Sequence, residues 1–288
     1  MEHSWSGAAI CICAFAVLQL AGCAEVPGSE GVQASASLTG TPGAPGARAE
    51  AQPADNMLRL AGDVEARGSL ATALPLYERA AAAPNATAPV HVKLGDIYTK
   101  LSRNDDAVAA YRAALAKDPD SAAAMLGLGG VLIRSGKTED GMAFLAKAAP
   151  VVNSAGAYDR LGVAHILLGH PREALASFEQ AHSLDPRDLD ISTNLALAAA
   201  LSGHKDKAVT LAQATARAEG VQDYQRRNLI LAMAISDKEE DAKRAASSGI
   251  GADDVDALIK QGRDIRQISS PKARALALGT VRSAAATN

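Results

Sequence analysis

The chain of 288 residues has few aromatic side chains and few cysteines. Phe, Trp and Tyr together make up 3% of it, with a single Trp, and there are three Cys. A β-sandwich or β-barrel would need Val, Ile, Thr and aromatic residues on its strands, so this composition argues against both. Ala supplies 64 residues, nearly half of a hydrophobic fraction of 48%. Because Ala has the highest helix propensity, the composition predicts an all-α protein whose helices pack closely.

Clustered positive charge and catalytic motifs are also lacking. The 29 basic and 32 acidic residues are spread along the chain, and no basic patch is present, so we expect no nucleic-acid partner. There is no Gly-x-Ser-x-Gly elbow. The segment from Gly130 to Gly136-Lys137-Thr138 misses the spacing of a phosphate-binding loop by one residue. The sequence therefore predicts no enzyme, no catalytic residue, no metal site and no cofactor other than a covalent lipid.

That lipid is predicted from the amino-terminal segment. Residues 7–22 carry no charge and are shorter than the roughly 20 helical residues that span a bilayer, but they fit the apolar region of a signal peptide. The run ends in Leu20-Ala21-Gly22-Cys23, which resembles the bacterial lipoprotein motif. The resemblance implies that residues 1–22 are removed and that Cys23 is lipidated. Residues 1–5 lack the usual Lys or Arg, so either the true start lies elsewhere or the N-terminal amine supplies the charge.

The same resemblance bears on the cysteines and on localisation. Cys11 and Cys13 would be lost with the signal peptide, so a chain lipidated at Cys23 keeps no free thiol for a disulfide or a metal. Ala24, where an Asp would retain the protein at the inner membrane, favours the periplasmic face of the outer membrane. Residues 23–55 hold the lipidated Cys and then Gly, Pro and Ala at short intervals, which is typical of a flexible tether.

From residue 54 onward a pattern recurs about every 34 residues. Its units start at Ala54, Ala88, Ala122, Ala155, Leu189 and Asp223. The fourth unit carries Leu161-Gly162, Ala174, Phe178, Ala181 and Pro186 at positions 7–8, 20, 24, 27 and 32. This pattern resembles the tetratricopeptide repeat. Positions 8, 20 and 27 hold Ala or Gly in every unit except at Thr215 and Ile230, as expected where two helices approach closely, and the aromatic at position 24 should fill the gap to the next unit.

The resemblance implies an α-solenoid of about five to six helix pairs over residues 56–250, with a capping helix and tail over residues 251–288. Residues 252–267 are predicted to form the capping helix. Its apolar residues should lie against the last repeat: Val255, Leu258, Ile259, Ile265 and Ile268. Pro271 is expected to end it, and the tail to Asn288 is either a weak helix or disordered.

Short fragments give a more specific likeness. They lie at residues 73–80, 83–85, 157–164 and 227–229 and near Ala252. Together with the lipidation motif they resemble the lipoprotein of tight-adherence (Tad, Flp-type) pilus assembly systems. The resemblance implies an outer-membrane factor that helps a secretin or its associated pilus machinery to assemble. The repeats alone leave open another envelope process, such as outer-membrane protein insertion, polysaccharide export or docking of peptidoglycan enzymes.

A partner protein is expected in the concave groove that the first helix of each pair lines. Positions 2, 5, 9 and 12 of each unit are expected to face it, and in the middle units they include these candidate groove residues: Leu126, Gly130, Ile133, Asp159, Val163, Ile166, Thr193 and Leu197. They are mostly apolar, which suits an amphipathic segment. The alternative is that several of them pack between repeats. Some tetratricopeptide domains grip a terminal carboxylate with Lys and Asn at positions 5 and 9, but Val92 and Asp96 stand there, so no such clamp is expected.

Overall fold

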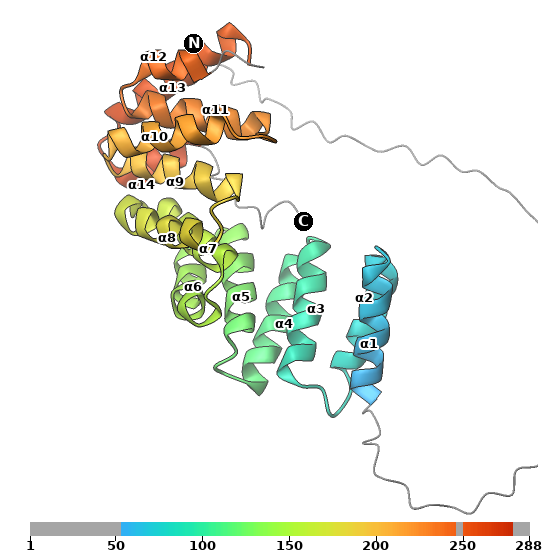
Figure 1. Ribbon diagram of the computed structural model, residues 1–288. Helices are drawn as coiled ribbons and strands as arrows, with labels where there is room; N and C mark the ends of the chain where they lie inside the picture. Colours follow the sequence, from blue (N-terminus) through green and yellow to red (C-terminus); the bar gives the residue numbers. More distant parts are fainter. Residues whose placement is uncertain (1–52, 246–249, 279–288) are drawn as a thin grey trace, which may run out of the picture. The chain divides into compact units, whose positions relative to one another are not determined.

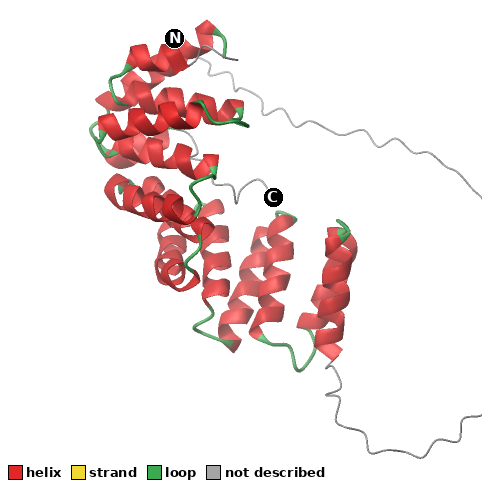
Figure 2. Cartoon of the chain, in the orientation of Figure 1, coloured by secondary structure: helices red, strands yellow, loops and turns green. Residues whose placement is uncertain are grey.

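The computed structural model describes residues 53–245 and 250–278, and every regular element in these two ranges is an α-helix (Figure 2). The predicted signal peptide, Cys23 and the tether up to residue 52 lie outside the described residues. The helices are α1 Pro53–Ala66, α2 Leu70–Ala81, α3 Ala88–Lys100, α4 Asn104–Lys117, α5 Ala122–Arg134, α6 Thr138–Val152, α7 Ala155–Leu168, α8 Pro171–Leu184, α9 Leu189–Leu201, α10 Lys205–Ala216, α11 Asp223–Ile235, α12 Glu239–Ala245, α13 Ala252–Gln267 and α14 Pro271–Ala277. Among these helices, none is both long and apolar enough to cross a membrane.

Helices α1 to α12 form six consecutive pairs, and each pair packs against the next one along the chain (Figure 1). The first helix of a pair is called helix A and the second helix B. Helix A of the last five pairs begins at the residue where the repeat pattern starts its unit, which confirms the predicted register and the all-α solenoid. The first pair begins at Pro53, three residues before the predicted solenoid boundary, because the fixed φ of proline suits the first position of a helix.

Small residues bring helix A and helix B of each pair together. The third pair is the extreme case, because Gly129 of α5 faces Gly141 of α6. A Cβ atom built on Gly141 would lie 2.7 Å from the carbonyl oxygen of Gly129, closer than real Cβ contacts come. The predicted role of positions 8 and 20 is confirmed here, since even Ala is too large where both helices carry glycine.

The aromatic residue of helix B fills space both within its own pair and against the next one. The ring of Tyr111 in α4 lies over Gly95 of α3, where a Cβ would come within 2.7 Å of it, and over Gly127 of α5, where the distance would be 2.3 Å. Phe178 of α8 lies in the same way over Gly162 of α7. The expectation that this aromatic fills only the gap between units was therefore incomplete.

The turn between helix A and helix B has a left-handed residue in all six pairs. Four of these residues are glycines with φ between 78° and 86°: Gly68, Gly136, Gly169 and Gly203. The second and sixth pairs use Ser102 at φ 58° and Asp237 at φ 66° instead. Side chains with a Cβ disfavour this conformation, so these two turns are strained where the other four are not.

The helix predicted over residues 252–267 is α13, and it packs on α11. Val255, Ile259 and Ile265 are buried in this contact, as expected. Gly262 allows the close approach, because a Cβ there would lie 2.4 Å from the Cβ of Ala234 in α11.

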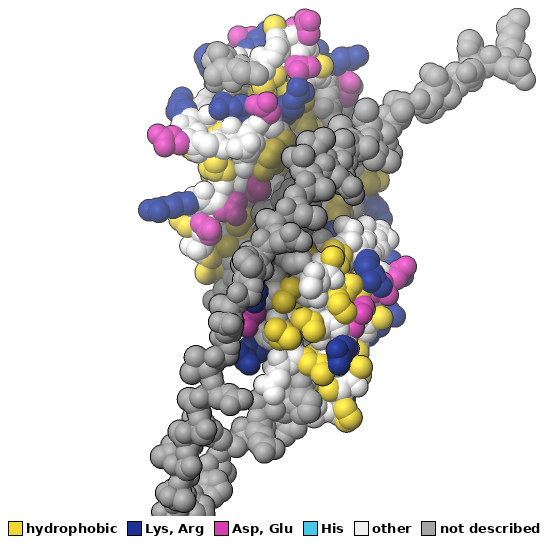
Figure 3. All heavy atoms as spheres, turned by 90° about the vertical axis from the view of Figure 1, so that its right-hand side faces the viewer, with side chains coloured by type: hydrophobic (Ala, Val, Ile, Leu, Met, Phe, Trp, Pro, Cys, Tyr) yellow, Lys and Arg dark blue, Asp and Glu magenta, His cyan; other side chains and the backbone are white. Residues whose placement is uncertain are grey.

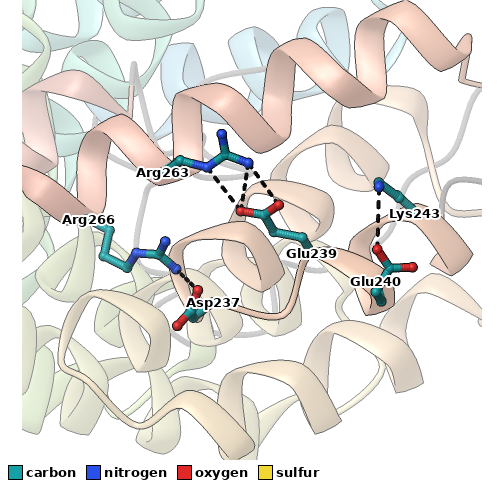
Figure 4. A network of polar contacts seen from close by, with 6 residues as sticks. All are labelled: Asp237, Glu239, Glu240, Lys243, Arg263 and Arg266. Atoms are coloured by element: carbon teal, nitrogen blue, oxygen red, sulfur yellow. Dashed lines mark hydrogen bonds and ion pairs between the residues drawn. The ribbon is translucent and has the colours of Figure 1, made fainter.

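Ion pairs hold the outer side of α13 to the sixth pair (Figure 4). Arg263 donates to both carboxylate oxygens of Glu239 at 2.9–3.1 Å, and Arg266 pairs with Asp237 in the turn before α12. The hydrogen bonds from Arg263 lower the pKa of Glu239. The charged contacts fix the register of α13 on the pair, while the apolar residues and Gly262 set its distance.

Part of the tail is helical, which was one of the two alternatives, and α13 ends at Gln267, before Pro271. Pro271 is the first residue of α14, where a missing amide costs nothing, and the hydroxyl of Ser270 accepts a hydrogen bond from the amide of Ala273. Helix α14 contacts α7 and α9 as well as α13. Lys272 lies so close to Gly169 that a Cβ on that glycine would be 2.5 Å from its amide nitrogen. The chain thus turns back from its last repeat onto the fourth and fifth pairs.

Candidate protein-binding groove

Helix A of the second, third and fourth pairs lines a cavity of about 430 Å³. The three helices α3, α5 and α7 contact each other in sequence, and α1 closes one side through Glu65. Apolar lining comes from Val92 and Leu126, and Gly130 leaves the backbone of α5 open, whereas Gly127 lies under the ring of Tyr111. This cavity is the open part of the groove that the sequence predicted.

Three of the eight predicted groove residues are partly exposed, and two of these line the cavity. The two that line the cavity are Leu126 and Gly130. Ile133 lies beside them in sequence, but its side chain is directed toward helix B, because its Cγ1 would be 2.7 Å from a Cβ on Gly141. It packs with the cluster that contains Leu145 and Leu161.

The other five predicted groove residues are buried inside the chain. Asp159 accepts a 2.9 Å hydrogen bond from the amide of Asn194, which joins α7 to α9, and the Thr193 hydroxyl donates to the Leu189 carbonyl oxygen at 2.6 Å. The remaining three belong to one buried cluster that also contains Ile265 of α13 and Ala275 of α14: Val163, Ile166 and Leu197. These five side chains pack between helices, which is the alternative given above. Their role in partner binding stays a prediction.

Helix α14 explains why the groove is open at one end only. Ile166 lies beside Pro271, Arg274 and Ala275 around a very small internal space. Because α14 covers α7 and α9 at this point, the surface of helix A that remains accessible runs from α3 to the first half of α7. The sequence could not show this, since the contacts of α14 with α7 and α9 join residues far apart along the chain.

The outer side of the first pair has no neighbouring pair among the described residues. Figure 3 views the chain from the α1–α2 side and shows hydrophobic side chains gathered over its lower part. Leu60 of α1 is 48% exposed, and Leu74 and Leu76 of α2 are partly buried in the first-pair cluster. This end of the stack is uncapped within the described ranges, whereas α13 covers the other end.

Two carboxylates in the cavity already have partners. Glu65 receives hydrogen bonds from Lys100 at 2.5 Å and from the Tyr77 hydroxyl at 2.6 Å. Partial burial works to raise the pKa of Glu65, but these two bonds outweigh it and the pKa lies below its usual value. Asp96 accepts a 2.7 Å bond from the Tyr111 hydroxyl, and its pKa is raised because burial outweighs that bond.

Two arginines in the cavity have no such partner. Arg134, at the end of α5, and Arg160, in α7, form no ion pair with any residue in the described ranges. The Nε atom of Arg160 is buried and has no hydrogen-bond partner there. Partial burial and the neighbouring Arg160 both lower the pKa of Arg134. Sequence reasoning missed both residues, although Arg134 follows the predicted groove residue Gly130 by four positions, which places it on the same helix face.

Two family models described as tetratricopeptide repeat match the chain, one over residues 92–158 and the other over residues 155–188. These ranges cover the three helices that form the cavity. The matched residues, 92–188, make up about a third of the chain and are similar to tetratricopeptide repeats. No curated protein matches it.

Solved structures share the fold of this chain at low sequence identity. The pilF protein of Pseudomonas aeruginosa is 17% identical with a TM-score of 0.59, over 73% of this chain and 98% of its own. YrrB, described as a tetratricopeptide protein with an unusual peptide-binding site, is 18% identical with a TM-score of 0.53, over 63% of this chain and 91% of its own. MamA from Desulfovibrio magneticus RS-1 is 19% identical with a TM-score of 0.53, over 60% of this chain and 98% of its own.

In the described part of the chain, no three His, Cys, Asp or Glu side chains are grouped so that they could hold a metal ion. The cavity presents apolar side chains, open helix backbone at Gly130 and guanidinium groups. Proteins of this fold class use such surfaces to bind other polypeptides.

Proposed function

We propose that this protein is a binding scaffold that holds a segment of a partner protein in the groove formed by α3, α5 and α7. The observation that carries this proposal is the 430 Å³ cavity along three successive A helices, which no element in the described ranges fills. An extended or helical segment would bury apolar side chains on Val92 and Leu126. Its path would end at α7, because α14 covers the continuation beside Ile166.

We further propose that the scaffold is a lipoprotein on the periplasmic face of the outer membrane and that it assists assembly of a Tad/Flp pilus, with the secretin or another assembly component as its partner. The Leu-Ala-Gly-Cys motif at residues 20–23 and the short fragments that resemble the Tad lipoprotein support this assignment. The lipid on Cys23 would supply the anchor, since more than one acyl chain gives stable membrane attachment.

The groove is tested by affinity capture of the full chain from membranes, with Leu126→Asp as the test variant and Leu184→Asp as its control. Leu126 lines the cavity, whereas Leu184 is 41% exposed at the end of α8 and outside it. We expect a secretin to be recovered with the wild type and the control, but not with Leu126→Asp. Equal recovery with Leu126→Asp would refute the groove, and a different envelope protein in every eluate would refute the pilus assignment.

The anchor is tested by labelling cells with radioactive palmitate. We expect label on the wild-type protein and none on a Cys23→Ser variant, because the thiol is the atom that would be acylated. Label that persists in Cys23→Ser would refute lipidation at this residue.

A further inference from the structure

The cavity carries more positive charge than its own carboxylates neutralise. Four basic residues line it: Lys93, Lys100, Arg134 and Arg160. Two carboxylates line it as well, Glu65 and Asp96, and Glu65 is already paired with Lys100. The remaining three cations thus face a single carboxylate, Asp96, on the α3 side.

The surplus charge is concentrated on the α5–α7 side. Arg160 has a buried Nε–H group without an acceptor in the described chain. Leaving a buried donor unsatisfied costs free energy, so an acceptor that reaches it from outside would be stabilising. Natural proteins keep few such groups, and Arg160, which lines the cavity, has neither an acceptor for this group nor an ion pair in the described chain.

Gly130 keeps the space between the two arginines open. A Cβ atom on Gly130 would lie 3.9 Å from Nη1 of Arg134 and 3.9 Å from Cδ of Arg160. The two side chains therefore flank this glycine from α5 and α7, and one group placed above Gly130 can contact both. Both residues belong to the cavity lining.

We propose that Arg134 and Arg160 together bind the carboxylate of an Asp or Glu side chain of the partner segment, above Gly130. Planar guanidinium groups match a carboxylate with two parallel hydrogen bonds each. The two arginines place the acidic residue between α5 and α7, and the apolar residues lie toward Val92 and Leu126. The site differs from the terminal-carboxylate clamp, whose positions hold Val92 and Asp96 here. This inference rests on the proposed protein-binding function and adds the chemistry of the partner.

The test is selection from a random heptapeptide display library on the full chain purified in detergent. We expect the wild type to enrich peptides that combine apolar residues with an Asp or Glu. The variant Arg134→Gln/Arg160→Gln should keep the apolar enrichment and lose the acidic one. The control Arg172→Gln/Arg187→Gln removes the same charge from two exposed residues outside the cavity and should select as the wild type does.

The affinity for one selected peptide is then measured by fluorescence anisotropy. Charge-assisted hydrogen bonds predict that Arg134→Gln weakens binding at least about tenfold, and that Glu→Gln in the peptide has the same effect. The two changes together should cost little more than either alone. Gly130→Ala keeps both charges and meets only ordinary contacts, but it occupies the site and should also weaken binding.

The possible outcomes distinguish failure of the carboxylate site from failure of the proposed protein-binding function. The carboxylate site would be overturned if the enriched peptides show no acidic preference, or if that preference persists in the double arginine variant. Either result would leave the groove in place. No enrichment over an unrelated protein would overturn both. Inorganic phosphate at millimolar concentration that displaces the peptide and binds alone would show a free-anion site and would also overturn the proposal.

Discussion

Replacing Ser102 with glycine should stabilise the protein. Ser102 occupies the left-handed turn position of the second pair at φ 58°, where four other pairs carry glycine. An L-residue in this conformation costs about 1–2 kcal/mol of folding free energy, which glycine relieves. Glycine in turn loses more conformational freedom on folding, which costs about 0.5–1 kcal/mol. Ser102 is exposed and its hydroxyl makes no contact that would be lost, so we expect a net gain of about 0.5–1 kcal/mol. Urea unfolding followed by circular dichroism measures it.

Three further variants isolate the cause of the gain from Ser102→Gly. Ser102→Ala keeps the strain and should change little. Ser135→Gly places glycine in the turn of the third pair at φ −85°, where nothing is relieved, and should lose stability. Asp237→Gly relieves strain but removes the ion pair with Arg266, so its gain should be smaller. A destabilised Ser102→Gly, or a gain as large from Ser135→Gly, would refute the reasoning.

Three more predictions concern the interior and are read by urea or thermal unfolding. Gly162→Ala puts a Cβ 2.6 Å from the ring of Phe178 and should cost about 1–3 kcal/mol, whereas Gly156→Ala meets nothing within 4 Å and should be neutral or stabilising. Leu197→Ala in the buried cluster should cost about 2–5 kcal/mol, and a loss below 1 kcal/mol would show that α14 does not cover it. Burial lowers the pKa of His165, so the folded state binds fewer protons than the unfolded chain, and stability should fall as the pH drops through about 6.5. That fall should shrink in His165→Gln, and an unchanged pH dependence would contradict it.

The repeat register was enough to predict the helices and their tight contacts. Helix A of the last five pairs starts where the pattern predicts, because local propensity, small residues and turn chemistry all recur with the same period. The helix over residues 252–267 also followed from its own apolar spacing. These features depend on residues close together in sequence, which is the information that a single sequence carries best.

The candidate site depended on contacts that no local pattern contains. Ile166 and Leu197 occupy groove positions of the repeat, yet they are buried in a cluster with a helix that begins at Pro271, more than two repeats later. Arg134 and Arg160 belong to different units, and their shared lack of partners appears only when α5 and α7 lie side by side. Repeat positions alone therefore pointed to the A helices but could not show which part of their surface is open.

Because α13 and α14 cover one end of the stack, we expect local unfolding to be easier at the other end. Helix α9 is buried from Ile191 to Leu201 and α11 from Leu229 to Ser236, because α13 and α14 add a further layer over them, whereas α1 and α2 face outward on one side. In a solenoid each repeat is held only by its neighbours, so amide hydrogens should exchange fastest in α1 and α2 and slowest in α9 and α11. The groove lies between the fast-exchanging and the slow-exchanging helices. A partner that spans α3, α5 and α7 would link the fraying end to the protected one, and binding should slow hydrogen exchange in the first pair, which contributes Glu65 to the cavity.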